Sequence, residues 1–202
     1  MARRKSARPL TRRAATRAEY RTVVIFCEGV RTEHDYLRAV KNLPGVRANT
    51  SVRIELDPKC GVPLTLVERA MERKRDKEID SCWCVFDVEW PRNHPHLGKA
   101  LELAKASDIG LAISNPCFEL WLILHHRDHT SFIDTHCAER DSRGLDGRAG
   151  KQIDAARYMP LRNQAHRRAS SLARLHADNG SELPRNNPSS GMFELLDALE
   201  RT

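Results

Sequence analysis

The sequence contains no long hydrophobic run. No uninterrupted apolar stretch exceeds five residues, and Leu120–Leu124 is one of these. A membrane-spanning helix needs ~20 such residues, so we expect no membrane association. Residues 1–21 also lack the apolar core of a secretory signal, and we therefore expect a cytoplasmic protein. An arginine-rich, acid-poor beginning is also typical of organelle transit peptides, and this alternative stays open.

Metal-binding cysteine pairs and nucleotide-binding loops are absent as well. Cys82-x-Cys84 lacks the two-residue spacer of a zinc knuckle, and no second pair follows it. Cys27, Cys84 and Cys117 lie in or beside apolar runs, where we expect buried, reduced thiols. The sequence contains neither GxxxxGK[ST] nor GxGxxG, which excludes the phosphate-binding loops of the known kinds.

The excess of positive charge belongs to the N-terminal segment. The net charge is +7, and residues 1–21 contain eight basic residues against one acid, whereas residues 22–202 contain 26 of each. We expect residues 1–21 to form a disordered basic tail and residues 22–202 to form one folded domain. The candidate nucleic-acid contacts in the tail are Arg3, Arg4, Lys5, Arg12 and Arg13. A solvated leader or a docking arm for a partner protein explains these charges equally well.

Short apolar segments alternate with amphipathic segments along the rest of the chain. The expected strands are 22–27, 51–56, 81–86 and 110–114, and the expected helices are 32–40, 64–77, 94–107, 118–125, 154–158, 162–175 and 191–201. Residues 127–150 are polar and are expected to form a long connection, and residues 181–190 a loop. This alternation predicts an α/β fold with a mostly parallel, Rossmann-like sheet, helices on both faces and a helical C-terminal part.

Acidic residues end two of the expected strands. Glu28 directly follows the first strand, and Asp87 and Glu89 follow the third. If the two strands are parallel neighbours, their carboxyl ends bring these side chains together at one edge of the sheet. Clustered carboxylates repel one another unless a proton or a cation lies among them, and hard oxygen ligands select Mg²⁺, Mn²⁺ or Ca²⁺. Glu33, in the first helical turn, is a candidate fourth ligand.

Each of these acids also has a simpler interpretation as a turn or helix-capping residue. Asp87 and Glu89 are two residues apart, so in continued strand geometry both side chains point to one face. Asn115 ends a strand and either faces the same crevice or completes the turn, while Glu119 either caps a helix or supports the metal ligands. His94 follows the acidic pair closely enough to reach the same site, although a solvated loop is the simpler interpretation.

Three strings resemble the signatures of RloB-like proteins. They are Phe26–Val40 (FCEGVRTEHDYLRAV), Asn115–His125 (NPCFELWLILH) and Asn187–Ser190 (NPSS), and together the matches span residues 22–200. The resemblance implies a Toprim-like domain in which Glu28 and the Asp87-x-Glu89 pair bind a divalent metal. Glu89 stands where the family usually has Asp, which affects the geometry more than the ligand chemistry.

Two functions from different classes follow from these observations. The first is a Mg²⁺- or Mn²⁺-dependent nuclease for DNA or RNA, with Glu28, Asp87 and Glu89 as catalytic carboxylates and Glu33 as a further ligand. The resemblance implies an effector of bacterial anti-phage defence that works with an ABC-type ATPase partner. The second function is a non-catalytic subunit that regulates or docks on such an ATPase. Association into a homo-oligomer stays open.

Overall fold

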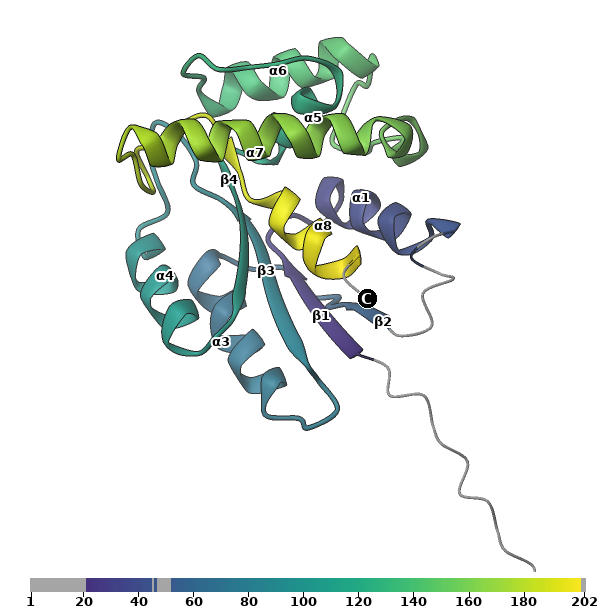
Figure 1. Ribbon diagram of the computed structural model, residues 1–202, viewed down its shortest axis with the longest axis vertical. Coiled ribbons are helices and arrows are strands. Elements are labelled where there is room, and N and C mark those ends of the chain that lie inside the picture. The colour runs from purple at the N-terminus through teal and green to yellow at the C-terminus, as the bar shows by residue number, and fades with distance from the viewer. Residues whose placement is uncertain (1–20, 45, 47–51, 201–202) are drawn as a thin grey trace, which may run out of the picture.

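The computed structural model describes residues 21–44, 46 and 52–200 (Figure 1). The expected basic tail lies outside the described residues, apart from its last residue, Arg21. The candidate nucleic-acid contacts Arg3, Arg4, Lys5, Arg12 and Arg13 therefore have no structural description. No helix in the described ranges is both long enough and apolar enough to cross a membrane.

Five strands form one sheet at the centre of the molecule. They are β1 (Arg21–Cys27), β2 (Val52–Leu56), β3 (Ser81–Asp87), β4 (Gly110–Asn115) and β5 (Ser189–Ser190). Their order is β2-β1-β3-β4-β5, in which the first four are parallel and β5 pairs antiparallel to the end of β4. The predicted α/β class with a mostly parallel sheet is thus confirmed. The two-residue β5 was missed, because Ser189 and Ser190 belong to a Pro/Asn-rich segment with no strand pattern of its own.

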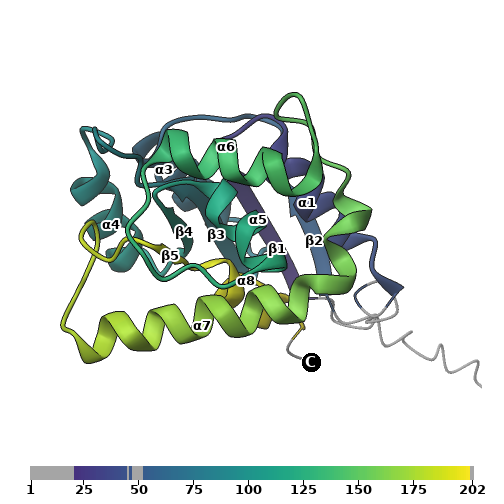
Figure 2. The same cartoon turned by 90° about the horizontal axis from the view of Figure 1, so that it is seen from above.

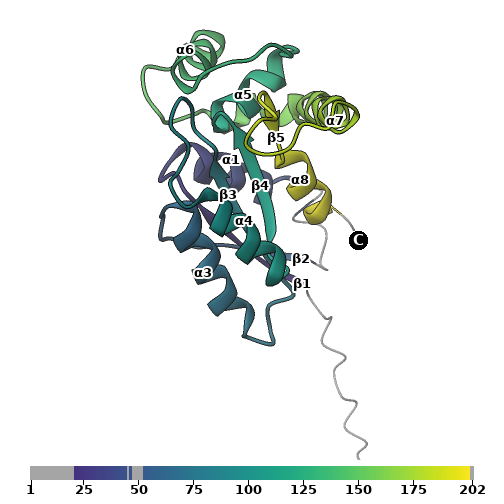
Figure 3. The same cartoon turned by 90° about the vertical axis from the view of Figure 1, so that its left-hand side faces the viewer.

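Helices cover both faces of the sheet and extend past its carboxyl edge. They are α1 (Thr32–Lys41), α3 (Pro63–Lys74), α4 (Leu97–Ala106), α5 (Phe118–His126), α6 (Thr135–Asp146), α7 (Arg162–Asp178) and α8 (Met192–Glu200), with short 3₁₀ turns at Ala155–Arg157 and Met159–Leu161. Helices α3 and α4 pack on one face, and α1 and α8 on the other (Figure 3). Helices α5, α6 and α7 stack at the carboxyl ends of the strands (Figures 1 and 3).

The alternation of side chains along β1 divides the core in two. Val24 and Phe26 pack into the cluster under α3 and α4, whereas Val23 and Ile25 pack into the larger cluster under α1, α5, α7 and α8. A parallel strand buried on both faces needs apolar residues at every position, which explains the continuous apolar run. Cys27, Cys84 and Cys117 are free and no more than 2% exposed, so their predicted burial is confirmed.

Helix α5 lies between α6 and α7 (Figure 2), and its residues from Phe118 to His125 are all buried. A helix that is apolar on all sides is stable only where other elements surround it. Trp121, at 0% exposure, is one of the largest fully buried side chains in the described part of the chain. The LWLIL run is therefore the centre of the second layer of the fold.

The prediction that residues 127–150 form a long connection was wrong, because they contain α6. The Asp134 carboxylate caps this helix by accepting a hydrogen bond from Cys137 N at 2.6 Å, and Gly147 ends it in the left-handed conformation with φ 74°. The inward face of α6 consists of Cys137, Ala138, Ser142 and Leu145, so small and polar residues largely replace the large apolar side chains by which a buried helix face is recognised in a sequence.

Candidate metal centre

A cavity of about 280 Å³ opens at the carboxyl ends of the parallel strands. Six acidic residues are among those that line it: Glu28, Glu33, Asp87, Glu89, Glu119 and Glu139. The cations at its wall are Arg31 and Lys151. All four predicted metal ligands thus line one cavity, in which the acids outnumber the cations among the lining residues.

Glu28 and Asp87 are brought together by the pairing of β1 with β3. Cys27 lies opposite Val85 in the parallel register, so the residues that follow both strands meet at the same edge. Asp87 N donates a hydrogen bond to Glu28 Oε2 at 3.0 Å, and His94 Nε2 lies 2.7 Å from Glu28 Oε1. One oxygen of the Glu28 carboxylate is therefore held by a backbone amide, and the other lies against the His94 ring.

Glu33 reaches the cavity from the first turn of α1. Its side chain is folded back so that Oε1 accepts a hydrogen bond from Gly29 N at 3.1 Å, and the residue is only 6% exposed. A Cβ atom at residue 29 would overlap the Glu33 carboxylate. The Glu-Gly-x-x-x-Glu spacing from Glu28 to Glu33 thus has a steric reason: the glycine leaves the space that the second carboxylate fills.

Glu89 enters the cavity through a turn and not through strand geometry. Val88 is fully buried on the opposite side, and Val88 N still donates to Ser114 O at 2.9 Å, so the parallel pairing extends by one residue beyond Asp87. At Glu89 the backbone becomes left-handed, with φ 65°, and Glu89 N donates to Pro116 O at 2.8 Å. The expected extended geometry for Glu89 was wrong, although its side chain still lines the cavity with that of Asp87.

The carboxylates raise one another's pKa values. The pKa of Asp87 is raised well above its ordinary value, first by burial and then by the charges of Glu33, Glu28 and Glu119. Burial likewise raises the pKa values of Glu28 and Glu33, and neighbouring acids add to this effect. A bound cation would relieve this repulsion, because it favours the charged form of every carboxylate around it.

Hard oxygen donors in an open arrangement fit Mg²⁺ or Mn²⁺. In the described part of the chain, no three of the cavity acids bring their oxygens within 4.8 Å of one another. Mg²⁺ in proteins is usually held by one or two carboxylates together with water and substrate phosphate, and it does not need a closed protein cage. The donor type therefore fits a metal held by one or two of these carboxylates, with water and a phosphate as the remaining ligands.

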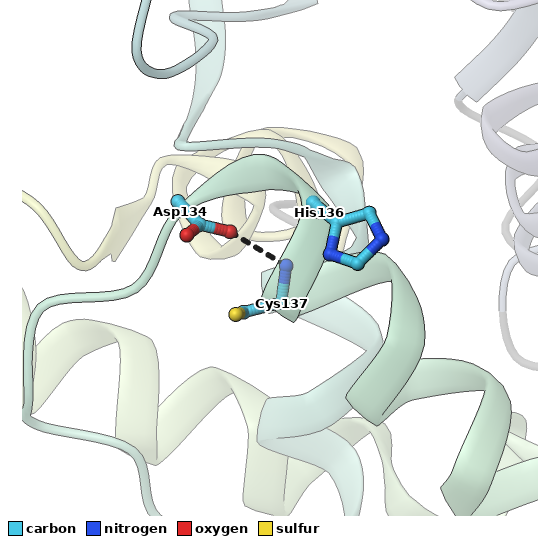
Figure 4. A group of neighbouring side chains, drawn as sticks. All are labelled: Asp134, His136 and Cys137. Carbon is cyan, nitrogen blue, oxygen red and sulfur yellow. Dashed lines mark hydrogen bonds between the residues drawn. The ribbon is translucent and has the colours of Figure 1, made fainter.

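A second group of candidate ligands lies at the start of α6 (Figure 4). The ligand atoms of Asp134, His136 and Cys137 all lie within 4.8 Å of one another. The Asp134 carboxylate is already engaged with Cys137 N, and the amino end of a helix carries partial positive charge that disfavours a cation. Helix capping thus accounts for Asp134, and we interpret this group as the start of α6.

Glu119 is tied to a buried arginine that the sequence did not identify. Glu119 lies in the first turn of α5, is 8% exposed, and has Oε1 3.7 Å from Arg148 Nη2. The guanidinium of Arg148 also contacts Asp146 Oδ2 at 2.6 Å and Ser142 Oγ at 2.9 Å, and Tyr158 donates to the same Asp146 oxygen at 2.5 Å. Glu119 therefore joins the cavity to a charged network that spans α5 and the end of α6.

Asn115 is not one of the residues that line the cavity. Its Nδ2 donates to Pro184 O at 2.9 Å and to Asn186 Oδ1 at 3.0 Å, and its Oδ1 accepts from Asn187 Nδ2 at 3.2 Å. Of the two alternatives left open for Asn115, this geometry favours the structural one. Its amide fastens the segment before β5 to the end of β4.

Arg31 and Lys151 are cavity residues that sequence reasoning missed. Thr32 Oγ1 donates to Lys151 O at 2.8 Å, which holds the segment after α6 against the start of α1. Both cations also line a wider cavity of about 670 Å³ formed with residues 149–154, so the two hollows meet at these side chains. Arg31 lies inside the EGVRTE string, but Lys151 has no local signal, because only the fold brings it to the site.

The comparisons with known proteins identify a family. Neither a search of curated proteins nor a search of solved structures returned a significant match. A family model described as RloB-like protein matches residues 23–199, which include every acid of the cavity and all of the described strands except the first two residues of β1. The chain therefore belongs to the RloB-like protein family.

Proposed function

We propose that the protein is a divalent-metal-dependent nuclease that cleaves phosphodiester bonds in DNA or RNA. The observation that carries the proposal is the convergence of carboxylates from separate strand ends on one cavity. Glu28 follows β1, Asp87 and Glu89 come from the end of β3, and Glu119 from the helix after β4. Such a concentration of buried negative charge is unfavourable by itself, and it is typical of sites that bind a cation and a phosphate together.

The residues that would hold Mg²⁺ or Mn²⁺ are Glu28, Glu33, Asp87 and Glu89. When bound, the metal would supply positive charge to the phosphate as negative charge develops there during cleavage. This assignment keeps the Toprim-like metal set that the RloB-like resemblance implies, with Glu89 in place of the usual Asp.

The chain's own residues supply the remaining requirements of the reaction. Glu28 is held by the Asp87 amide and by His94, and a fixed carboxylate is suited to accept a proton from an attacking water. Arg31 and Lys151 stand where the two cavities meet and would bind the phosphates next to the cleaved bond. The basic segment before β1 would add affinity for the polyanion that falls with increasing salt.

The proposal includes the setting that the family resemblance implies, an effector of anti-phage defence controlled by an ABC-type ATPase. An unregulated nuclease damages the nucleic acid of its own cell, so we expect a partner that controls its activity. Co-expression in bacteria provides a check. Without the ATPase, the toxicity of the protein should be the same in infected and uninfected cells, whereas with the ATPase it should appear only on infection.

The metal site is tested with Asp87→Asn. Adding Mg²⁺ or Mn²⁺ should raise the melting temperature of the wild type, because a ligand that binds the folded state stabilises it by RT ln(1 + [L]/Kd), about 1.4 kcal/mol at ten times Kd. Asp87→Asn should abolish this shift while slightly raising the stability of the metal-free protein, because it removes one repelling charge. The matched control is Glu102→Gln, an exposed acid on α4.

Cleavage is measured with end-labelled single-stranded and duplex DNA and RNA in Mg²⁺ and in EDTA. The wild type and Glu102→Gln should cleave only with metal, and Asp87→Asn should not cleave. A wild type whose melting temperature is indifferent to metal and which leaves every substrate intact would contradict the nuclease proposal and favour the non-catalytic docking function.

A further inference from the structure

Two large aromatic side chains are exposed and in contact with each other. Trp90 is 41% exposed and Phe132 is 58% exposed, and their ring centroids lie 5.3 Å apart at an interplanar angle of 84°. They come from different segments, the loop between β3 and α4 and the loop between α5 and α6. The nuclease chemistry proposed above uses neither ring, and neither belongs to one of the two core clusters.

The pair stands at the edge of the acidic cavity. Trp90 directly follows Glu89, and Trp90 N donates a hydrogen bond to Thr135 Oγ1 at 3.0 Å. Glu89 and Thr135 both line the cavity. The backbone that carries the tryptophan is therefore attached to the cavity wall on both sides.

Hydrogen bonds to the backbone hold both aromatic residues in place. Asn93 Nδ2 donates to Glu89 O at 2.8 Å, which closes the turn around Trp90. Next to Phe132, Asn187 accepts from Ile133 N at 3.1 Å and donates to Ile133 O at 2.9 Å. Asn187 belongs to the NPSS string, so this string has a function in the fold: it fixes the loop that presents Phe132.

The chemistry around the pair indicates what binds there. The cations Arg31 and Lys151 line the same cavity that Glu89 and Thr135 line, and carboxylates suited to a metal lie among them. A ligand that matches this set carries phosphates for the cations and the metal, and a planar ring for the aromatic pair. Nucleic acid offers both, because its phosphates are anionic and every base has a planar face that stacks on aromatic side chains.

We propose that Trp90 and Phe132 form a platform for an unpaired base of the substrate: because the two rings are nearly perpendicular, the base stacks on one ring and meets the other edge to face. This inference rests on the proposed nuclease function and specifies its substrate class, which is single-stranded nucleic acid or a strand with an unpaired base next to the cleaved bond. In a continuous duplex both faces of each base are covered by its neighbours, so a duplex cannot use the platform.

The test measures binding and stacking without cleavage. The full-length Asp87→Asn protein is titrated, in Mg²⁺ and in EDTA, against a short single-stranded RNA that carries one 2-aminopurine, against the same sequence as DNA, and against the matching duplexes. Anisotropy gives the affinity, and quenching of the 2-aminopurine fluorescence reports stacking on an aromatic ring. Trp90→Ala, Trp90→Phe and Phe132→Ala are compared in this background, with Leu175→Ala, an exposed apolar residue on α7, as the matched control.

Trp90→Ala should weaken single-strand binding by about 5- to 150-fold, because alanine substitution of a stacking residue costs about 1–3 kcal/mol per base. It should also abolish the quenching and leave duplex binding unchanged. Phe132→Ala should also weaken single-strand binding and reduce the quenching. Trp90→Phe should retain most of the quenching, and Leu175→Ala should bind and quench like the Asp87→Asn protein. Phe132 is the more exposed of the two, so this variant keeps the test decisive if Trp90→Ala does not fold.

Several results would overturn the platform. Unchanged single-strand affinity and quenching in both alanine variants would do so, as would an equal loss of single-strand and duplex binding. Loss of self-association in sedimentation, with oligonucleotide binding intact, would assign the pair to a protein contact and overturn the proposal as well. If the wild type cleaves nothing in Mg²⁺ while the quenching persists and depends on Trp90, the platform is supported and the nuclease function is refuted.

Discussion

At Gly29 the cavity leaves no space for a side chain. The Glu33 carboxylate occupies the position of a Cβ atom and accepts the hydrogen bond from Gly29 N. Because the obstacle is the end of a flexible side chain, an added methyl group would displace Glu33 and leave the backbone in place. The glycine is therefore required for the position of the second carboxylate more than for the fold.

Gly29→Ala should consequently separate metal affinity from stability. We expect the Mg²⁺-dependent rise in melting temperature to require about 10-fold more metal, because a misplaced group at a metal site typically lowers metal affinity by about this factor. The stability of the metal-free protein should change only slightly. Gly144→Ala is the control: no atom lies within 4 Å of a Cβ there, and alanine in the α6 interior should stabilise the fold by about 0.5–1 kcal/mol. Equal metal affinity in Gly29→Ala and the wild type would show that Glu33 is not a ligand.

A second residue, His125, is buried as a neutral imidazole far into the core. Trp121 O can only accept, so His125 Nδ1 donates to it at 2.8 Å, and Nε2 then accepts from the Tyr36 hydroxyl at 3.1 Å. Burial, together with the nearby charges of His126 and Arg168, lowers the pKa of His125 to about 3, against the opposing effect of the Trp121 carbonyl. The ring fills the space between Tyr36 and Tyr158 and is a structural element of the core.

This histidine should make folding sensitive to mild acid. Its folded pKa is depressed below the unfolded value of about 6.5, so the unfolded state binds more protons between these values. Stability from this group is therefore present above pH ~6.5 and falls by up to about 1.4 kcal/mol per pH unit on acidification. Urea unfolding is measured at pH values from 7 to 4.5. As the pH falls, the free energy of unfolding of the wild type should approach that of His125→Gln. The exposed His136→Gln serves as the control, and a constant gap between wild type and His125→Gln would contradict the prediction.

At the scale of elements, α5 and α6 are joined by buried charge as well as by apolar packing. Arg148 follows α6 and is 8% exposed, and it lies between Glu119 of α5 and Asp146 at the end of α6. The Arg148 guanidinium pairs with both carboxylates, and Asp146 also accepts hydrogen bonds from the Tyr158 hydroxyl and from Arg148 N. The position of Glu119 at the cavity is therefore set by a residue that reaches it across two helices.

Arg148→Met should be strongly destabilising, by about 3–5 kcal/mol, because it leaves buried carboxylates without their cation. Urea denaturation of the metal-free protein measures this directly. Arg143→Met, which removes the more exposed pair with Glu139, should cost less than about 1 kcal/mol. Adding Glu119→Gln to Arg148→Met should recover part of the loss. If the double variant is no more stable than Arg148→Met, the Glu119 contact contributes nothing to this network.

At the scale of the whole molecule, charge is distributed unevenly along the chain. Residues 1–21 hold the positive excess, while residues 22–202 are neutral overall and place six of their acids around one cavity at the carboxyl edge of the sheet. Arg31 and Lys151 lie at the same edge, and Trp90 and Phe132 flank it. The proposed metal, phosphate and base sites thus all lie at the carboxyl end of the sheet, which is the general position of ligand sites in open α/β sheets.

Much of this arrangement follows from local patterns. The run from Val23 to Cys27 could form only a buried strand, and acids placed directly after it and after β3 must meet once the two strands are parallel neighbours. The string EGVRTE predicts that Glu28 and Glu33 lie close together, and both line the cavity, because the glycine, the carboxylate and the helix start are all within one turn. Helix α6 was missed for the converse reason: its signals are a cap and a left-handed glycine, with too little apolar surface to mark a buried face.

The sequence by itself thus determined the fold class, the strand ends and the carboxylates, because strand burial and capping act between residues close together in the chain. Only the tertiary structure decided how these groups are completed. Contacts between segments that are distant in sequence determine the positions of His94, Lys151 and Arg148 and bring Trp90 against Phe132. The left-handed turn at Glu89 likewise depends on a hydrogen bond to Pro116 O. Such contacts leave no periodicity, since their energy comes from the closure of loops around a core that the periodic elements have already formed.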